Sequence, residues 1–176
     1  DGMTLHWLRP IPPLEQARGR LRFFDTDKAE IALLGGRQRV GAKGGFLTAT
    51  AGKMTITGLA VRDQLATVEV EANGTAANAV ALMREPRLRL LDRQKLDLRD
   101  PGGDVSAKAV VDFPLEKVIK PEEIAVKVTA QTSKLRLAGL VAGRDLDQGE
   151  LRIEANDDGL TVKGRAAVAG IDDAER

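Results

Sequence analysis

The feature that most constrains this chain is the alternation of apolar and polar residues over most of its length, with only one helical segment. The stretch "GELRIEANDDGLTVKGRAAVAG", residues 149–170, is its clearest example. Leu151 and Ile153 alternate with charged residues before an Asn-Asp-Asp-Gly turn, and Leu160 and Val162 alternate with polar residues after it. A side-chain period of two is that of a strand with one apolar and one polar face. Each such strand needs something to cover its apolar face.

Similar alternation, punctuated by Gly-Gly, Ala-Gly and Asp-containing turns, predicts an antiparallel meander of about 10–12 short strands. The candidate strands span residues 20–24, 28–34, 38–42, 46–50, 53–58, 65–72, 87–91, 95–98, 104–113, 124–131 and 134–139, followed by the hairpin of residues 149–170. A break is expected at "DPGGD", residues 100–104.

Residues 76–84, "AANAVALMR", form the best helix signal, because good helix formers precede Pro86 as a stop. The Pro-rich segment of residues 6–19 is not expected to form a regular strand, and Pro13 could begin a short helix over residues 14–17. The Pro-bounded link of residues 114–123 has room for one helical turn.

The sheet poses a covering problem. A helix of this size is ~15 Å long, whereas the predicted strands would make a sheet ~50 Å wide. Two packed sheets, a closed barrel, or a curled open sheet covered by something else would each solve it. Aromatic residues are only 3% of the chain, and a face of short aliphatic side chains suits a long apolar ligand as well as packing on itself. The residues alone leave all three architectures open.

Composition argues against several function classes. The net charge is +1, with 27 basic and 26 acidic residues, which gives no electrostatic reason to expect nucleic acid as a partner. Cysteine and tyrosine are absent, His6 is the only histidine, and Ser106 and Ser133 are the only serines. Neither serine has the surroundings of a nucleophile, and the usual zinc ligand sets cannot be assembled. We therefore expect no enzyme activity, no metal and no cofactor.

Local motifs that suggest ligand sites fail in detail. Gly36 and Gly41 have phosphate-loop spacing, but Ala42 separates Gly41 from Lys43 and no Ser or Thr follows. The Asp-x-Asp pairs at residues 25–27 and 145–147 lack the further acidic ligands of a calcium loop. The Gly-rich segment is interpreted as a hairpin pair, and the two Asp-x-Asp pairs are interpreted as solvated turns.

The chain starts with Asp1 and contains no run of apolar residues long enough to cross a membrane. We expect residues 1–176 to be a single β-rich segment of a longer protein. A recurrent apolar-x-apolar-x-Gly pattern, as in residues 54–58 and 160–164, predicts loosely similar halves at 14–86 and 87–170.

Three stretches carry a family resemblance. "PIPPLEQARGRLRFF" leads a Pro-Leu segment into a Gly-x-Leu-x-Phe strand, "ATVEVEANGTAANAVALMREP" joins a strand ending in Gly to a short helix, and "GDVSAKAVVDFPL" ends a strand in Phe-Pro-Leu. This pattern resembles the AsmA-like family of bacterial envelope proteins, in particular the central region of its long YhdP-type members. The hairpin of residues 149–170 is similar to a hairpin that recurs in that family.

The resemblance implies a curled, groove-like sheet, open like a half-barrel, with a β-sandwich or closed barrel as the alternative. It implies a non-enzymatic segment of a periplasmic protein that an upstream helix tethers to the inner membrane, with flanking β segments on either side. Its apolar face would contact phospholipid acyl chains during lipid transport to the outer membrane. The other hypothesis is a self-contained module with a scaffold or protein-interaction role.

The residues expected to contact lipid are the apolar members of the alternating runs. They are Val68, Val70, Val105, Val111, Ile124, Val126, Val128, Leu151, Ile153, Leu160 and Val162.

Overall fold

A computed structural model of the chain describes residues 2–7, 11–41, 44–61, 63–85, 98–116, 119–141 and 143–168. These residues form nine strands, one α-helix and one 3-10 turn. The strands are β1 (Met3–Leu5), β2 (Leu14–Phe23), β3 (Ala29–Val40), β4 (Gly45–Thr57), β5 (Leu65–Thr75), β6 (Arg99–Pro114), β7 (Ala125–Val141), β8 (Arg144–Ala155) and β9 (Leu160–Val168). The helix α1 (Ala76–Met83) follows β5, and the 3-10 turn η1 (Pro121–Glu123) precedes β7.

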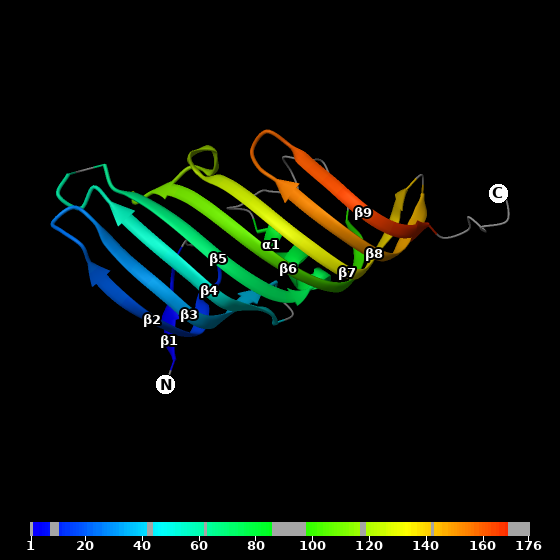
Figure 1. The fold of residues 1–176 in the computed structure, drawn as a ribbon, viewed down its shortest axis with the longest axis horizontal. Coiled ribbons are helices and arrows are strands. Elements are labelled where there is room, and N and C mark those ends of the chain that lie inside the picture. Colours follow the sequence, from blue (N-terminus) through cyan, green and yellow to red (C-terminus); the bar gives the residue numbers. More distant parts are fainter. Residues whose placement is uncertain are drawn as a thin grey trace.

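The nine strands lie side by side in sequence order, from β1 at one edge to β9 at the other, and every neighbouring pair is antiparallel (Figure 1). In the described part of the chain, the two edges do not pair with each other. The protein is therefore mainly β, with one curled open sheet and one short helix, as the sequence predicts. The described strands are fewer and longer than the short ones expected.

Strands are longer because glycines and bulges lie within them instead of ending them. The strands expected at 28–34 and 38–42 join in β3, those at 46–50 and 53–58 join in β4, and those at 124–131 and 134–139 join in β7. Gly36 lies within β3. A Cβ atom at this position would be only 3.0 Å from Leu14 Cγ, so the presence of glycine here is explained by close packing and not by a turn. The break expected at residues 100–104 also lies inside a strand, β6.

Four bulges keep the apolar side chains on one face of the sheet. Gln16, Asp100, Lys134 and Gln148 have φ values between 42° and 52°, and each lies where the pairing register of its strand shifts. An extra residue in one strand reverses which alternate positions face a given side. The bulge in β7 therefore lets Leu135 continue the face that residues 126–130 begin.

Two expectations for the Pro-rich segment of residues 6–19 are wrong. Residues 14–17 do not form a short helix, and residues 14–19 do belong to a strand, because they begin β2. Leu14 pairs with Leu5 on one side and with Gln38 on the other, and both Leu14 and Ala17 are buried. Pairing on both sides satisfies the backbone that an isolated helical turn would leave unsatisfied.

The helix, the 3-10 turn and the C-terminal hairpin were predicted correctly. The Thr75 hydroxyl caps α1 by accepting a hydrogen bond from the backbone N–H of Asn78 at 3.2 Å. In the hairpin turn, Asn156 Oδ1 accepts the backbone N–H groups of Asp158 and Gly159, each at 3.0 Å.

The strands expected at 87–91 and at 95–97 lie outside the described residues, and Leu98 is not in a strand. The boundary predicted near residue 86 also lies outside them. On either side of that boundary, β5 and β6 pair along the whole of β5, from Leu65 opposite Pro114 to Thr75 opposite Asp104. The division into two similar halves stays a prediction.

Candidate functional site: the apolar face of the sheet

The cross-strand register brings the eleven predicted lipid-contacting residues to one face of the sheet. Val68 lies opposite Val111, which lies opposite Val126. Ile153 lies opposite Val162 in the β8–β9 hairpin. Val70, Val105, Val128, Leu151 and Leu160 share this face because each lies an even number of residues from a member on the same strand. Ile124 immediately precedes β7 and packs in one cluster with Val111 and Val126. We call this surface the apolar face.

The register also adds residues that the sequence prediction omitted. Leu21 lies opposite Ile31, Ile31 opposite Met54, and Met54 opposite Val68. The apolar face thus extends across β2, β3 and β4 as well as the strands that were predicted to form it. Alternation in residues 28–34 and 53–58 is the sequence signal that could have identified these positions.

The centre of the apolar face is covered by the chain itself. Val111, Ile124 and Val126 are 4%, 1% and 4% exposed, in a cluster with Ile11 and Ile119. Trp7, from the N-terminal segment, and Leu82, from α1, also pack against this cluster. Much of the cover therefore comes from segments that lie outside the sheet strands.

Gln38 fastens the N-terminal segment to the sheet. Its side-chain Oε1 accepts a hydrogen bond from Trp7 Nε1 at 3.0 Å, and its Nε2 donates to the carbonyl oxygens of Pro12 at 2.7 Å and Arg39 at 2.9 Å. Gln38 is the buried polar residue among the described hydrophobic core. A buried amide with its partners in place costs little and fixes the position of what it binds.

The β8–β9 end of the apolar face is more open. Val162 is 48% exposed, and Leu151, Ile153 and Leu160 are half-buried. A solvent-open recess lies where the β8–β9 turn meets β7, with Val128, Ala155 and Leu160 among its lining residues. Of the eleven predicted positions, Val111, Ile124 and Val126 are buried, Val162 is exposed and the other seven are half-buried. The exposed position lies on the edge strand β9.

The opposite face of the sheet is charged. Lys53 Nζ lies 2.8 Å from Glu69 Oε1, and Lys108 Nζ lies 3.8 Å from Glu71 Oε1. The hydrogen bond and the charge of Lys53 lower the pKa of Glu69, and the same contacts raise the pKa of Lys53. Thr67 adds a hydrogen bond to Asp112 at 2.5 Å. This face is suited to water, and exposed pairs of this kind contribute little to stability.

Asp25 and Asp27 lie in the turn between β2 and β3, as predicted, but the turn predicted at residues 145–147 is wrong, because Asp145 and Asp147 lie in β8. Asp25 Oδ1 accepts the N–H groups of Asp27 at 2.7 Å and Lys28 at 2.8 Å. Asp145 Oδ1 accepts the N–H of Gly139 at 3.0 Å. A backbone hydrogen bond from Gln148, followed by Arg136, lowers the pKa of Asp147. Among the described residues, no group of three or more acidic, histidine or cysteine side chains could hold a metal ion.

In the part of the chain that the structure describes, the remaining motif residues do not form a ligand site with a histidine or cysteine; Ser106 and Ser133 are diagonal neighbours on β6 and β7. Gly36 is in β3 and Gly41 is in the turn after it, while Ala42 and Lys43 lie outside the described residues. His6 and the two serines, Ser106 and Ser133, are exposed. No helix in the described ranges is long and apolar enough to span a membrane.

Comparison with family models, with curated proteins and with solved structures found no match for this chain.

Proposed function

We propose that this chain is a non-enzymatic segment of an AsmA-like envelope protein and that the accessible end of its apolar face contacts phospholipid acyl chains. In this proposal the segment is periplasmic, tethered to the inner membrane through a region outside this chain, and continuous with further β segments. Its role is in lipid transport between membranes and in maintenance of the outer membrane.

One observation carries the proposal. The register collects apolar side chains from β2 to β9 on a single face, while the opposite face presents Lys, Arg, Asp and Glu. A sheet that is apolar on one side and open at its edges can shield hydrocarbon from water. Dispersion contacts with methylene groups have no directional requirement, so an acyl chain could slide along such a face.

The burial of individual side chains limits which part of the apolar face an acyl chain would contact. The central cluster around Ile124 is filled by Ile11 and Ile119, so acyl chains would reach it only if those segments moved away. Ile153, Leu160 and Val162 need no such movement, since they are half-buried or exposed. We therefore assign the acyl-chain contact to the β8–β9 end.

The sealed centre favours a second candidate, a self-contained scaffold or protein-interaction module. In that case the apolar residues serve only to pack the sheet against its own N-terminal segment, as Trp7 and Ile11 do. The two candidates differ in whether phospholipid accompanies the protein.

Lipid extraction of gently purified protein, followed by mass spectrometry, tests the proposal. Phospholipid should co-purify with the wild-type chain, and Ile153→Asp should reduce the amount at least about tenfold, because burying an apolar chain against a charge is unfavourable. Arg152→Asp, one residue away on the charged face, is the matched control and should retain lipid. Absence of phospholipid from repeated preparations would favour the interaction module.

A further inference from the structure

Two turns lie side by side at one end of the sheet. The β2–β3 turn spans residues 24–28, and the described part of the β4–β5 turn comprises residues 58–61 and 63–64. The backbone N–H of Leu59 donates to the carbonyl of Asp27 at 3.1 Å, and the N–H groups of Gly58 and Ala60 reach the Asp27 carboxylate at 3.4 Å. Asp27 therefore holds the two turns together as one structural unit.

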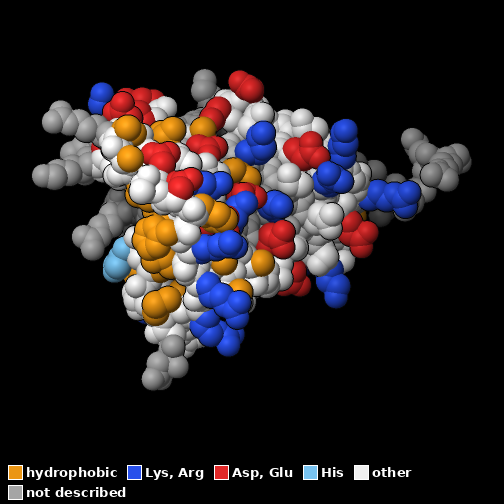
Figure 2. Space-filling view, turned by 60° about the vertical axis from the view of Figure 1, so that its left-hand side comes forward, with side chains coloured by type: hydrophobic (Ala, Val, Ile, Leu, Met, Phe, Trp, Pro, Cys, Tyr) orange, Lys and Arg blue, Asp and Glu red, His pale blue; other side chains and the backbone are white. Residues whose placement is uncertain are grey.

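Exposed hydrophobic side chains gather at this end. Eight large hydrophobic residues are exposed in the described part of the chain, and five of them belong to these turns or to the strand ends beside them. Figure 2 brings this end forward and shows hydrophobic side chains gathered on one side of the view, beside Lys and Arg side chains. These five residues, which we call the turn rim, are between 47% and 66% exposed: Leu21, Phe23, Phe24, Val61 and Leu65.

The hydrophobic residues of the turn rim come from both faces of the sheet and from the turns. Leu21 and Phe23 lie on the apolar face, opposite Ile31 and Ala29. Leu65 alternates with the buried Ala66 and so lies on the opposite face, while Phe24 and Val61 are in the turns themselves. A rigid partner would cover one side of such an end, whereas a fluid lipid layer surrounds it on all sides. The distribution therefore favours a membrane surface over a docked protein.

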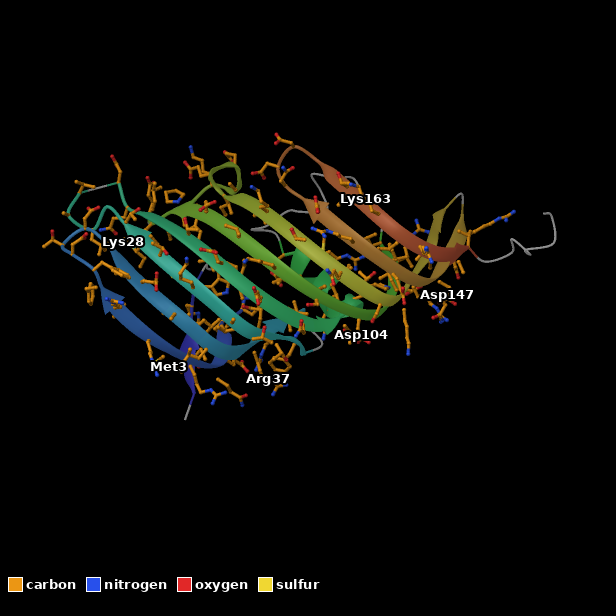
Figure 3. The ribbon with its side chains drawn as sticks, viewed as in Figure 1. Met3, Lys28, Arg37, Asp104, Asp147 and Lys163 are labelled. Atoms are coloured by element: carbon orange, nitrogen blue, oxygen red, sulfur yellow. The ribbon has the colours of Figure 1, made fainter. Side chains whose placement is uncertain are left out.

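The charges at the turn rim suit a phospholipid head-group region. The Arg22 guanidinium lies 4.7 Å from the centre of the Phe24 ring, and Lys28 Nζ lies 5.3 Å from it. Lys28 is at the end of the sheet next to this turn (Figure 3). An aromatic ring beside cationic groups matches an interface where acyl chains meet phosphates.

Acidic groups also lie at this end, and they bear on whether an anionic or a zwitterionic membrane surface matches its charge. Asp25 and Asp27 accept backbone hydrogen bonds, Glu30 lies opposite Arg22 across the strands, and Asp63 is exposed. The local charge is mixed, so a net negative membrane is not required. A zwitterionic phospholipid surface supplies phosphates for the two cations and hydrocarbon for the rim.

We propose that the turn rim inserts into the head-group region of a phospholipid bilayer and docks the sheet end-on at a membrane surface. Insertion would be shallow, about 5–10 Å, as for other interfacial protein segments. The inference concerns a membrane surface and does not require lipid on the apolar face.

The absence of native cysteine permits a specific probe. A Phe24→Cys variant carries an environment-sensitive fluorophore, and Leu34→Cys, 55% exposed on β3 and outside the rim, is the control. With phosphatidylcholine vesicles, the probe at residue 24 should shift to shorter wavelength and be quenched by brominated acyl chains. The probe at residue 34 should do neither. Equal responses at the two positions would overturn the proposal.

Vesicle co-sedimentation gives a second readout without labels. The double variant Phe23→Ser with Phe24→Ser should bind phosphatidylcholine vesicles at least about tenfold more weakly, since two exposed rings no longer enter the bilayer. Leu34→Ser should bind as the wild type does, and circular dichroism checks that both variants are folded. Vesicles that also contain phosphatidylglycerol should bind with similar strength.

Two outcomes would reject membrane docking. One is a wild-type chain that does not sediment with either vesicle. The other is concentration-dependent self-association, abolished by the double variant, without vesicle binding; the occupant of the rim would then be a second copy of the chain. Either result leaves the proposal of acyl-chain contact intact, because that proposal is tested separately, by measuring the phospholipid bound at β8 and β9.

Discussion

At the scale of single residues, Gln38 is the polar side chain that is buried among the described residues, and it makes three hydrogen bonds. Its side chain is 7% exposed and is hydrogen-bonded to Trp7 Nε1 and to the carbonyl oxygen of Pro12. Its amide is specific in a way that the surrounding aliphatic contacts are not, since only one arrangement of the N-terminal segment satisfies all its hydrogen bonds.

Replacement of this amide should loosen the cover of the sheet. Gln38→Leu keeps the volume but leaves Trp7 Nε1 and the Pro12 carbonyl without their partner, so we expect the free energy of unfolding to fall by ~1–3 kcal/mol. Urea unfolding followed by Trp7 fluorescence measures the change. Gln131→Leu, on the exposed side of β7, is the control and should change stability by less than about 0.5 kcal/mol. Equal stability of both variants would contradict this role of Gln38.

At the scale of elements, β7 shows how far the two faces differ. Val126 lies in the sealed cluster, while Lys127 points to the charged face. Because Val126 is covered by the chain itself, a change there tests folding rather than lipid contact. The experiment on lipid contact belongs at β8 and β9.

The two faces of β7 should respond unequally to the same charge. Val126→Asp places a carboxylate in an apolar cluster, so the free energy of unfolding should fall by ~3 kcal/mol or more. Lys127→Asp is solvated and should cost less than about 1 kcal/mol. Thermal unfolding of the two variants provides the comparison. Similar melting temperatures would mean that the centre of the apolar face is open to solvent.

Element boundaries explain what the sequence could and could not predict. The helix was predictable because good helix formers precede Pro86, and both are local signals. The strand ends were not, because Gly36 and Asp100 look like turn residues but lie within strands, Gly36 in a close contact and Asp100 in a bulge. Whether a glycine ends a strand or allows another chain to approach depends on residues far away in the sequence, such as Leu14.

Part of the candidate site was likewise predictable from the sequence, and part was not. Periodicity identified which residues share a face, because alternation is a local property of each strand. It did not predict that Trp7 and Ile11 would cover the centre, since the Pro-rich segment carries no periodic signal. Cover by an irregular segment is set by long-range contacts such as those of Gln38, which no short window of sequence contains.

At the scale of the whole molecule, an open sheet with one apolar and one charged face unites the observations. The apolar face passes from a covered centre to an accessible β8–β9 hairpin. The turn rim lies at the strand ends on the β2 to β5 side (Figure 1). Acyl-chain contact and membrane docking are thus assigned to different parts of the sheet and can be tested separately.

The central claim is that lipid contacts one face and not the other, and neighbouring residues of β9 test it most directly. Val162 is on the apolar face opposite Ile153, whereas Lys163 lies opposite Arg152 on the charged face. A photo-crosslinking residue at each position, in protein exposed to labelled phospholipid, reports contact at one-residue resolution. The account predicts strong labelling at residue 162 and little at residue 163. Equal labelling at both positions, or none at residue 162, would contradict it.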